Sequence, residues 1–211
     1  MDTVNILVLG GPGSGKSSLL FSYDRGVFLN TALPTELHVE RTISRGKKTQ
    51  HLNIIDGGPV SRILEVAPSL MPSVDLIILC FDVSDRGSMT TALNVLNYVE
   101  LHSEDCLCCP CATRSVTRPK LVVVGTKADL RFNQDLLFEL FDSQQSMVSP
   151  HEGREFALSV RADLYWETSA LFHEGVDELF YEIFTLFNPG LFKRFRELTV
   201  KLSRSALVLV S

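Results

Sequence analysis

The sequence predicts an α/β fold: a doubly wound, mostly parallel, six-stranded sheet with helices on both faces. Short, nearly continuous apolar runs alternate along the 211 residues with segments of helical period, which is typical of strands that a parallel sheet buries on both sides. Glycine-rich or polar loops directly follow several of these runs, at the edge where such sheets bind ligands. A chain of this length can bury the core of a single domain.

The predicted strands are of two kinds. The second strand alternates, with Val39 and Ile43 on one face and Glu40 and Thr42 on the other, and a turn at 45–48 leads into the third. This pair predicts an antiparallel hairpin, whereas the remaining strands are nearly continuously apolar and predict parallel pairing. In chain order the predicted strands are 3–9, 36–44, 51–55, 76–81, 120–125 and 164–167.

The predicted helices follow from apolar residues spaced three and four apart. The strongest period begins at Val176, from which apolar residues recur at i+3, i+4, i+7, i+8 and i+11 before Asn188-Pro189-Gly190 ends the helix. Prolines limit a short helix at 62–70. The predicted helices are 18–23, 62–70, 88–101, 132–145, 152–160 and 176–187.

The loop after the first strand carries the clearest chemistry. Its sequence, Gly10-Gly11-Pro12-Gly13-Ser14-Gly15-Lys16-Ser17, fits the phosphate-loop pattern. Glycines let backbone N–H groups turn toward a phosphate, Lys16 supplies a positive charge, and Ser17 offers a hydroxyl to Mg²⁺. A chance glycine turn is the alternative, but the strand before the loop and the helix after it favour a phosphate site.

Composition excludes several classes of protein. The apolar fraction of 45% argues against disorder, and the net charge of −5 argues against a general nucleic-acid binder. The five cysteines are more typical of reduced thiols in the cytosol than of a disulfide framework. With no signal peptide and no apolar run of membrane-spanning length, we expect a cytoplasmic protein.

Five motifs in the family's order resemble the small GTPases of the Ras superfamily, and the Rho branch in particular, over residues 3 to about 188. They are the phosphate loop, Phe28 with Pro34-Thr35, Asp56, the segment 124–131 and the segment 167–171. The Rho-like features are Gly125-Thr126-Lys127-Ala128-Asp129-Leu130-Arg131, the helical stretch at 132–145 and Pro150-His151-Glu152-Gly153-Arg154.

This resemblance implies GTP or GDP and Mg²⁺ as cofactors. Asp129 would accept from guanine N1 and N2, the Ser169-Ala170 backbone would donate to guanine O6, and Lys127 would pack its stem on the base. For Asp129 a helix cap and for Ser169 an ordinary turn are the alternatives. The implied nucleotide residues are Gly13, Ser14, Gly15, Lys16, Ser17, Ser18, Phe28, Thr35, Thr126, Lys127, Asp129, Ser169, Ala170 and Leu171. The implied Mg²⁺ residues are Ser17, Thr35 and Asp56.

The segment that begins at Asp56, which this family calls the second switch, departs from the family's sequence. Where the family has Asp-Thr-Ala-Gly-Gln-Glu, the chain has Asp56-Gly57-Gly58-Pro59-Val60-Ser61. Val60 has no polar atom to orient a water, and Pro59 has no N–H for the γ-phosphate. Pro12 stands at a position that is usually glycine, and Ala32 replaces a tyrosine that often covers the nucleotide. No catalytic residue is therefore assigned.

The sequence thus predicts a signalling protein that binds guanine nucleotide, hydrolyses GTP slowly or not at all, and acts through protein effectors or regulators. The alternatives are a conventional switch with partner-supplied catalysis and a nucleotide-free interaction scaffold. We expect a GTPase domain at 3–188, with a cysteine-rich insertion at about 103–118 and a Rho-type insert at about 132–146, followed by a basic amphipathic extension at 189–211.

Two features leave their roles open. Cys106, Cys108, Cys109 and Cys111 cluster in the first insertion, either as free thiols, as an acylation cluster or as metal ligands, although the spacing suits one Zn²⁺ poorly. The extension ends without a cysteine for prenylation. Its apolar stripe and basic residues at 191–209 predict a helix that lies on an anionic membrane, docks a partner or packs on its own domain.

Overall fold

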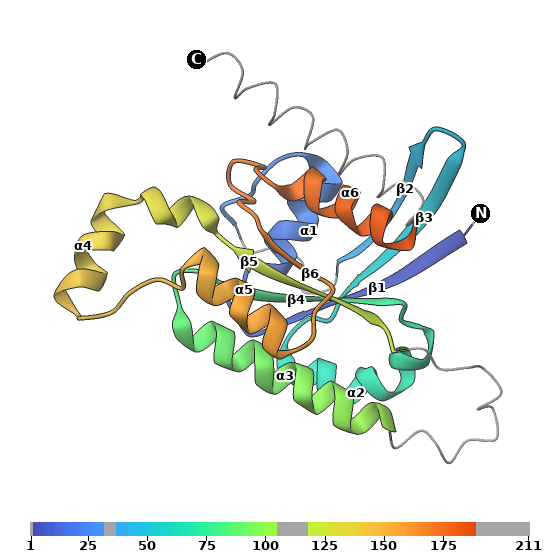
Figure 1. Cartoon of the computed structure of the whole chain (residues 1–211), viewed down its shortest axis with the longest axis horizontal. Helices are drawn as coiled ribbons and strands as arrows, with labels where there is room; N and C mark the ends of the chain where they lie inside the picture. The colour runs from blue at the N-terminus through green and yellow to red at the C-terminus, as the bar shows by residue number, and fades with distance from the viewer. Residues whose placement is uncertain (1, 32–36, 105–117, 189–211) are drawn as a thin grey trace, which may run out of the picture. The chain divides into compact units, whose positions relative to one another are not determined.

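The computed structural model describes residues 2–31, 37–104 and 118–188 (Figure 1). The chain divides into two compact units, Met1–Val176 and Asp177–Ser211, and the sheet lies in the first. Thr35, Ala32, the cluster Cys106–Cys111 and the segment 189–211 lie outside the described residues, so the predictions for them stay predictions. In the described parts of the chain, no helix is long and apolar enough to cross a membrane.

The first unit contains a six-stranded sheet in the order β2-β3-β1-β4-β5-β6. Only the β2–β3 hairpin is antiparallel, and β1 pairs with both β3 and β4 in parallel. The predicted fold class is therefore confirmed. The strands are β1 (Asp2–Gly10), β2 (His38–Arg45), β3 (Lys48–Asp56), β4 (Leu76–Asp82), β5 (Lys120–Thr126) and β6 (Leu164–Glu167).

Helices cover both faces of this sheet. Figure 1 shows α1 on one face and α2, α3 and α5 on the other. Their bounds are α1 (Lys16–Arg25), α2 (Val60–Leu70), α3 (Arg86–Glu104), α4 (Gln134–Asp142) and α5 (Pro150–Ser159), with 3₁₀ helices η1 (Met71–Ser73) and η3 (Ala128–Phe132). Helix α6 (Val176–Phe187) forms nearly all of the described second unit, and its apolar positions include the buried Leu179, Phe180, Ile183 and Phe184.

Alternate residues of the central strands build the core under α2, α3 and α5. Leu79 and Phe81 of β4 belong to one buried cluster with Ile63 of α2, Leu96 of α3 and Phe156 of α5. The rings of Phe81 and Phe156 meet edge to face with centroids 5.9 Å apart, a favourable geometry for aromatic pairs. This core fixes the strands whose carboxyl ends carry the polar loops.

Helix α2 differs from its predicted bounds of 62–70. It begins at Val60, because the Pro59 carbonyl accepts from the N–H groups of Arg62 and Ile63 and so closes the first turn. It also passes Pro68, which lies only two residues before the end of the helix. Proline favours a helix start through its fixed φ, so the helix begins two residues before its predicted start.

Candidate nucleotide-binding site

The predicted site residues gather at the carboxyl edge of the parallel strands. The strands β1, β3, β4 and β5 run in the same direction, and β6 follows β5 in parallel. At their carboxyl ends, β1, β3 and β4 lead into the segments before α1, α2 and α3. Strand β5 leads into η3, and β6 leads into the loop before α6. Such an edge is where open α/β sheets bind ligands.

Glycines shape the loop between β1 and α1. Gly13 and Gly15 have φ values of 70° and 77°, which favour glycine. A side chain on Gly10 would run into the Cys80 carbonyl of β4, and a Cβ on Gly11 would lie 2.7 Å from the Thr91 methyl of α3. The loop is therefore pressed between neighbouring elements, with Pro12 exposed at its tip.

Lys16 and Ser14 are held inside this loop. Lys16 is 7% exposed, and its Nζ donates to the carbonyl oxygens of Gly10 at 3.0 Å and Gly11 at 2.9 Å. The buried Ser14 hydroxyl also donates to the Gly11 carbonyl, at 2.8 Å. The loop thus keeps a positive charge and the N-terminus of α1 together, which is the electrostatics that a phosphate group requires. Ser17 and Ser18 lie in the first turn of α1.

Two of the predicted Mg²⁺ residues are in direct contact. The Ser17 hydroxyl donates to Asp56 Oδ2 at 2.6 Å, although the residues come from α1 and the end of β3. Asp56 is 1% exposed, and its Oδ1 accepts from the Gly58 N–H at 2.8 Å. A hydroxyl and a carboxylate are the hard oxygen donors that Mg²⁺ prefers. The residues present therefore fit this ion.

Asp129 is held by a serine from another loop. The Ser169 hydroxyl donates to Asp129 Oδ1 at 2.6 Å, linking η3 to the loop after β6. The Ser169 N–H, however, donates to the Glu174 carbonyl at 2.9 Å. The predicted donation from this amide to guanine O6 would require this bond to be exchanged, and it stays a prediction, as does the donation from the Ala170 amide.

Thr126 connects loops within the protein. Its buried hydroxyl lies 2.8 Å from the Ser14 carbonyl oxygen and 3.0 Å from that of Phe81. A Cβ on Gly15 would come within 2.9 Å of the same hydroxyl. The sequence predicted a nucleotide residue here, and the structure shows a side chain that fastens the phosphate loop to β4 and β5.

Lys127 is fixed by a carboxylate that sequence reasoning missed. Its backbone has a φ of 57°, and its Nζ donates to Asp82 Oδ2 at 2.7 Å. Asp82 is 7% exposed, and its Oδ1 accepts from both the N–H and the hydroxyl of Ser84. The available signal was an aspartate directly after the buried β4 run. This pair sets the direction of the Lys127 stem.

An ion pair links η3, which carries Asp129, to β6, which leads into the loop with Ser169. Arg131 of η3 donates twice to the Glu167 carboxylate of β6, at 3.0 and 2.9 Å. The Tyr165 hydroxyl donates to Glu167 Oε1 at 2.6 Å, and burial together with this carboxylate raises the pKa of Tyr165. Sequence reasoning assigned no role to Glu167 or Tyr165. They stabilise the spacing between η3 and the loop that carries Ser169.

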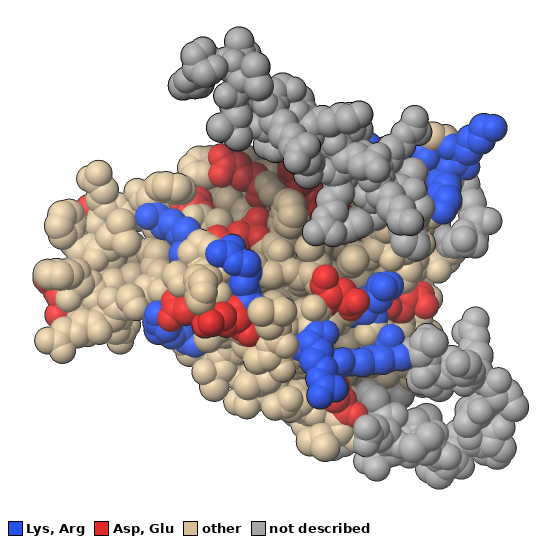
Figure 2. All heavy atoms as spheres, in the orientation of Figure 1, with Lys and Arg blue, Asp and Glu red and all other residues tan. Residues whose placement is uncertain are grey.

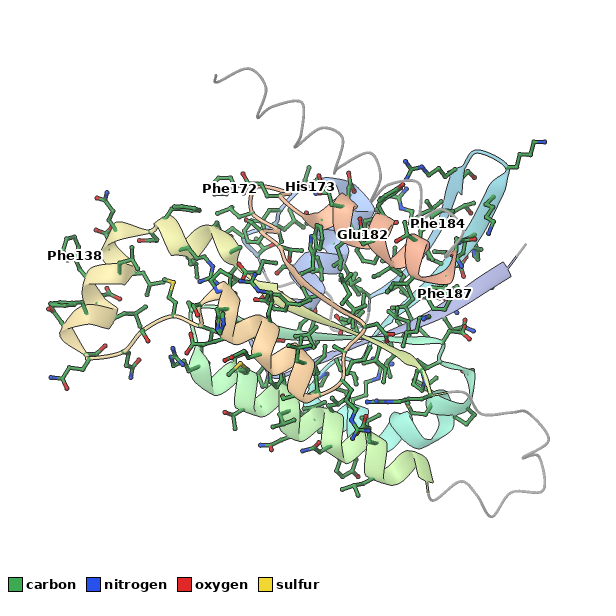
Figure 3. All side chains as sticks on the ribbon, viewed as in Figure 1. Phe138, Phe172, His173, Glu182, Phe184 and Phe187 are labelled. Carbon is green, nitrogen blue, oxygen red and sulfur yellow. The ribbon has the colours of Figure 1, made fainter. Side chains whose placement is uncertain are left out.

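The remaining predicted residues are less enclosed. Phe28 is half-buried in the segment after α1, and Leu171 is 48% exposed beside Phe172, which is 64% exposed. Figure 3 labels Phe172 and His173 in this loop. His173 Nδ1 lies 2.8 Å from the Ser22 hydroxyl of α1. The loop is therefore tied to the helix that follows the phosphate loop.

The second switch has few groups to offer a γ-phosphate. The Gly57 N–H donates to the Val8 carbonyl at 2.9 Å, and the Gly58 N–H donates to Asp56. Pro59 has no N–H at all. Val60, at the start of α2, packs against the buried core cluster. The side chain at the family's glutamine position is thus partly buried against the core.

Cys80 lies beneath the phosphate loop as a neutral thiol. It is fully buried in β4, opposite Gly10 in the strand register. Burial is the largest effect and raises the pKa of Cys80 to about 12, although the Lys16 charge lowers it. A thiol with this pKa is inert at neutral pH, so Cys80 fills space next to the loop and supplies no nucleophile.

The fold and these loops define a P-loop nucleotide-binding domain. A sequence model of the Ras family matches residues 5–188. The chain is 31% identical over 182 residues to the human Rho-related GTP-binding protein RhoD, covering 85% of this chain and 80% of that protein. It is also 28% identical to the Rho-related protein racI of Dictyostelium discoideum over 185 residues, covering 85% and 84%. The chain therefore belongs to the Ras family, with Rho-like relatives.

Proposed function

We propose that this protein binds GTP and GDP with Mg²⁺, hydrolyses GTP slowly or not at all, and acts through protein effectors or regulators. The observation that carries the proposal is a contrast within one site. Residues that the family implies for binding are in contact, as in the pairs Ser17–Asp56 and Ser169–Asp129. The position expected to direct water is occupied by Val60, which is partly buried against the core cluster.

Guanine binding is supported by the family and by the held carboxylate. Two relatives are described as Rho-related, and RhoD is described as GTP-binding. Asp129 can accept from two adjacent donors of guanine that adenine does not offer together, and the Ser169 hydroxyl keeps its carboxylate in one orientation. Ser17 and Asp56 would hold Mg²⁺ together with Thr35, and the ion would offset the phosphate charge.

Slow hydrolysis is supported by the second switch. A glutamine amide can orient the attacking water, and the valine side chain has no polar atom to do so. The Gly57 and Gly58 amides are bonded inside the chain, and Pro59 contributes none. The missing glutamine amide and the missing N–H groups would weaken stabilisation of the transition state more than binding of the nucleotide. The chain would then bind GTP but hydrolyse it slowly.

For its location we propose the cytoplasm, with peripheral membrane contact through 191–209. The basic residues of that segment would be attracted to anionic lipid. Sedimentation of the full chain with vesicles of increasing phosphatidylserine content tests this. Binding that rises with the anionic fraction is expected, and no sedimentation at any composition would overturn the membrane contact.

The nucleotide and its turnover can be measured directly. We expect the purified full chain to release GDP or GTP on denaturation, and we expect a preloaded protein to retain GTP in a single-turnover assay with Mg²⁺. Absence of nucleotide together with no micromolar binding would overturn the proposal. Rapid intrinsic turnover would contradict the interpretation of Val60.

A double variant tests the cause of slow turnover. Pro59→Gly with Val60→Gln should raise the single-turnover rate by at least about tenfold, which corresponds to about 1.4 kcal/mol in the barrier. The matched control is Pro59→Ala with Val60→Ala, which restores the N–H but supplies no amide side chain. An unchanged rate in the glutamine variant would indicate that Pro12 blocks the reaction.

A further inference from the structure

Helix α4 carries an apolar surface that the proposed nucleotide site does not use. We call it the α4 patch and define it by Leu137, Phe138 and Phe141 of α4 and by Phe132, the last residue of η3. Their side chains are 85%, 43%, 69% and 79% exposed, and Figure 3 shows Phe138 directed away from the sheet. Single exposed leucines are ordinary, but three exposed phenylalanines within ten residues are typical of an interaction site.

The helix that presents this patch is well formed. The Asn133 side chain accepts from the Leu136 N–H at 3.1 Å and caps the first turn, and the Ser143 hydroxyl donates to the Glu139 carbonyl at 2.9 Å at the other end. The exposed side chains are thus displayed by a capped helix whose other apolar residues, Leu136 and Leu140, are half-buried.

A hollow lies beside the patch. It has a volume of about 320 Å³, large enough to receive a bulky apolar side chain. Arg131 lines it but is held in its ion pair with Glu167. The other lining residues are Leu137, Leu140, Phe141, Gln145, Ser146 and Met147. One apolar side chain of a partner could therefore enter this hollow while its neighbours contact the α4 patch.

One flank of the patch is acidic. Asp135, Glu139 and Asp142 recur at i, i+4 and i+7, which places them in one row along the helix. All three residues are exposed, and α4 contains no lysine or arginine. In Figure 2 the surface in the region of α4 is mainly uncharged, with acidic atoms at its outer edge. A partner must therefore bring positive charge next to its apolar residues.

We propose that the α4 patch docks a basic amphipathic helix of a partner protein. The apolar residues of that helix, spaced three and four apart, would cover Phe138 and Phe141 and enter the hollow, while its lysines or arginines would face the acidic row. A second copy of this chain fits less well, because two acidic rows would face each other. An anionic membrane would be repelled by the same row. This docking does not require bound nucleotide.

Synthetic helical peptides of about five turns serve as the probe. One has a leucine and phenylalanine stripe flanked by lysine, and its counterpart has glutamate in place of every lysine. We expect the full chain to bind the lysine peptide in a fluorescence anisotropy titration. Phe138→Gln with Phe141→Gln, which leaves the charge unchanged, should weaken this binding by about tenfold or more.

The matched control is Leu101→Gln with Leu158→Gln, at side chains that are 67% and 74% exposed elsewhere on the first unit. This control should bind the lysine peptide within about twofold of the unchanged chain. Reversing the acidic row with Asp135→Lys, Glu139→Lys and Asp142→Lys should also weaken binding, by about tenfold.

Three results would overturn the proposal. The first is equal weakening in the control and in the phenylalanine variant, and the second is equal binding of the glutamate peptide. The third is evidence for a different occupant. In that case the unchanged chain would dimerise in sedimentation equilibrium or bind phosphatidylcholine vesicles, and the phenylalanine variant would abolish this association while still binding the peptide. Because all substituted side chains are exposed, circular dichroism should show the same folded state for every variant.

Discussion

In the proposed site, the Ser169 hydroxyl would act on the nucleotide through Asp129. It is a positioning residue, since its bond to Asp129 Oδ1 fixes the carboxylate that the base would meet. Removing one such hydrogen bond costs about 1 kcal/mol. We therefore expect Ser169→Ala to weaken GDP affinity about fivefold, measured by displacement of a fluorescent guanine nucleotide.

Ser159→Ala is the control for this substitution, because the Ser159 hydroxyl donates only locally, to the Phe156 carbonyl at the end of α5. It should leave GDP affinity unchanged. Equal affinity in the Ser169 variant would mean that Asp129 keeps its orientation without the hydroxyl, and the assigned positioning role would be wrong.

Gly153 shows how close packing can reverse a helix preference. Alanine in the middle of a helix is ordinarily more stable than glycine by about 1 kcal/mol. In α5, however, a Cβ at this position would lie 2.8 Å from Tyr165 Cε2 and still closer to the phenol oxygen. Overpacking of this kind costs about 1–3 kcal/mol, and Tyr165 is restrained by its bond to Glu167.

We expect Gly153→Ala to destabilise the protein by about 1–2 kcal/mol, measured as a lower urea midpoint at unchanged slope. Leu158→Ala is the control on the exposed side of the same helix, where the exposed fraction is 74%. It should change stability by less than about 0.5 kcal/mol. A rise in stability on Gly153→Ala would show that the tyrosine moves aside.

At the scale of single elements, α5 depends on a charged cap. The Glu152 N–H donates to the Ser149 hydroxyl and the Ser149 N–H donates to the Glu152 carboxylate, which forms a capping box. These bonds to Ser149, and then the Arg86 guanidinium at 2.7 Å, lower the pKa of Glu152 from 4.5 to about 2. The folded state therefore favours the ionised carboxylate.

Because this folded-state pKa is depressed, its contribution to stability is present above about pH 4.5 and is lost as the pH falls toward 2. We expect Glu152→Gln to be less stable than the unchanged chain at pH 7, with the difference shrinking through pH 4 and 3. Urea unfolding across this range measures it. A difference that does not vary with pH would mean that the carboxylate charge is unimportant to the cap.

At the start of helix α2, two residues that differ from the family's motif both stabilise the helix. Pro59 supplies the carbonyl for the first turn, and Val60 then contributes an apolar contact to the core. In the family's motif these positions belong to glycine and glutamine, which serve the phosphate. Here Pro59 and Val60 instead stabilise the start of α2, through a hydrogen bond and apolar packing that do not require a ligand.

At the scale of the whole molecule, the six strands, their one antiparallel hairpin and most helices could be predicted because periodicity and apolar runs are local. The strand at 164–167 and the helix at 176–187 have the predicted bounds. What could not be predicted depends on contacts between distant segments. Asp82 meets Lys127 and Thr126 meets Ser14 only after β4, β5 and the phosphate loop are assembled. Likewise, a sequence cannot show that Phe138 and Phe141 stay exposed.

Because the site is assembled from distant loops, nucleotide should stabilise the whole first unit. A ligand at a hundred times its Kd that binds only the folded chain adds about 2.7 kcal/mol. For a domain of this size, each kcal/mol shifts Tm by about 2–4 °C. We therefore expect GDP with Mg²⁺ to raise Tm by roughly 5–10 °C in a thermal melt.

ADP at the same concentration should give no shift, because Asp129 selects for the guanine donors, and EDTA should reduce the GDP shift, because Ser17 and Asp56 would lose their ion. An equal shift with ADP would show that the Asp129–Ser169 pair does not discriminate between bases. No shift with either nucleotide at millimolar concentration would mean that the Ser17–Asp56 and Ser169–Asp129 contacts serve only the fold, and the chain would then act as a scaffold without nucleotide.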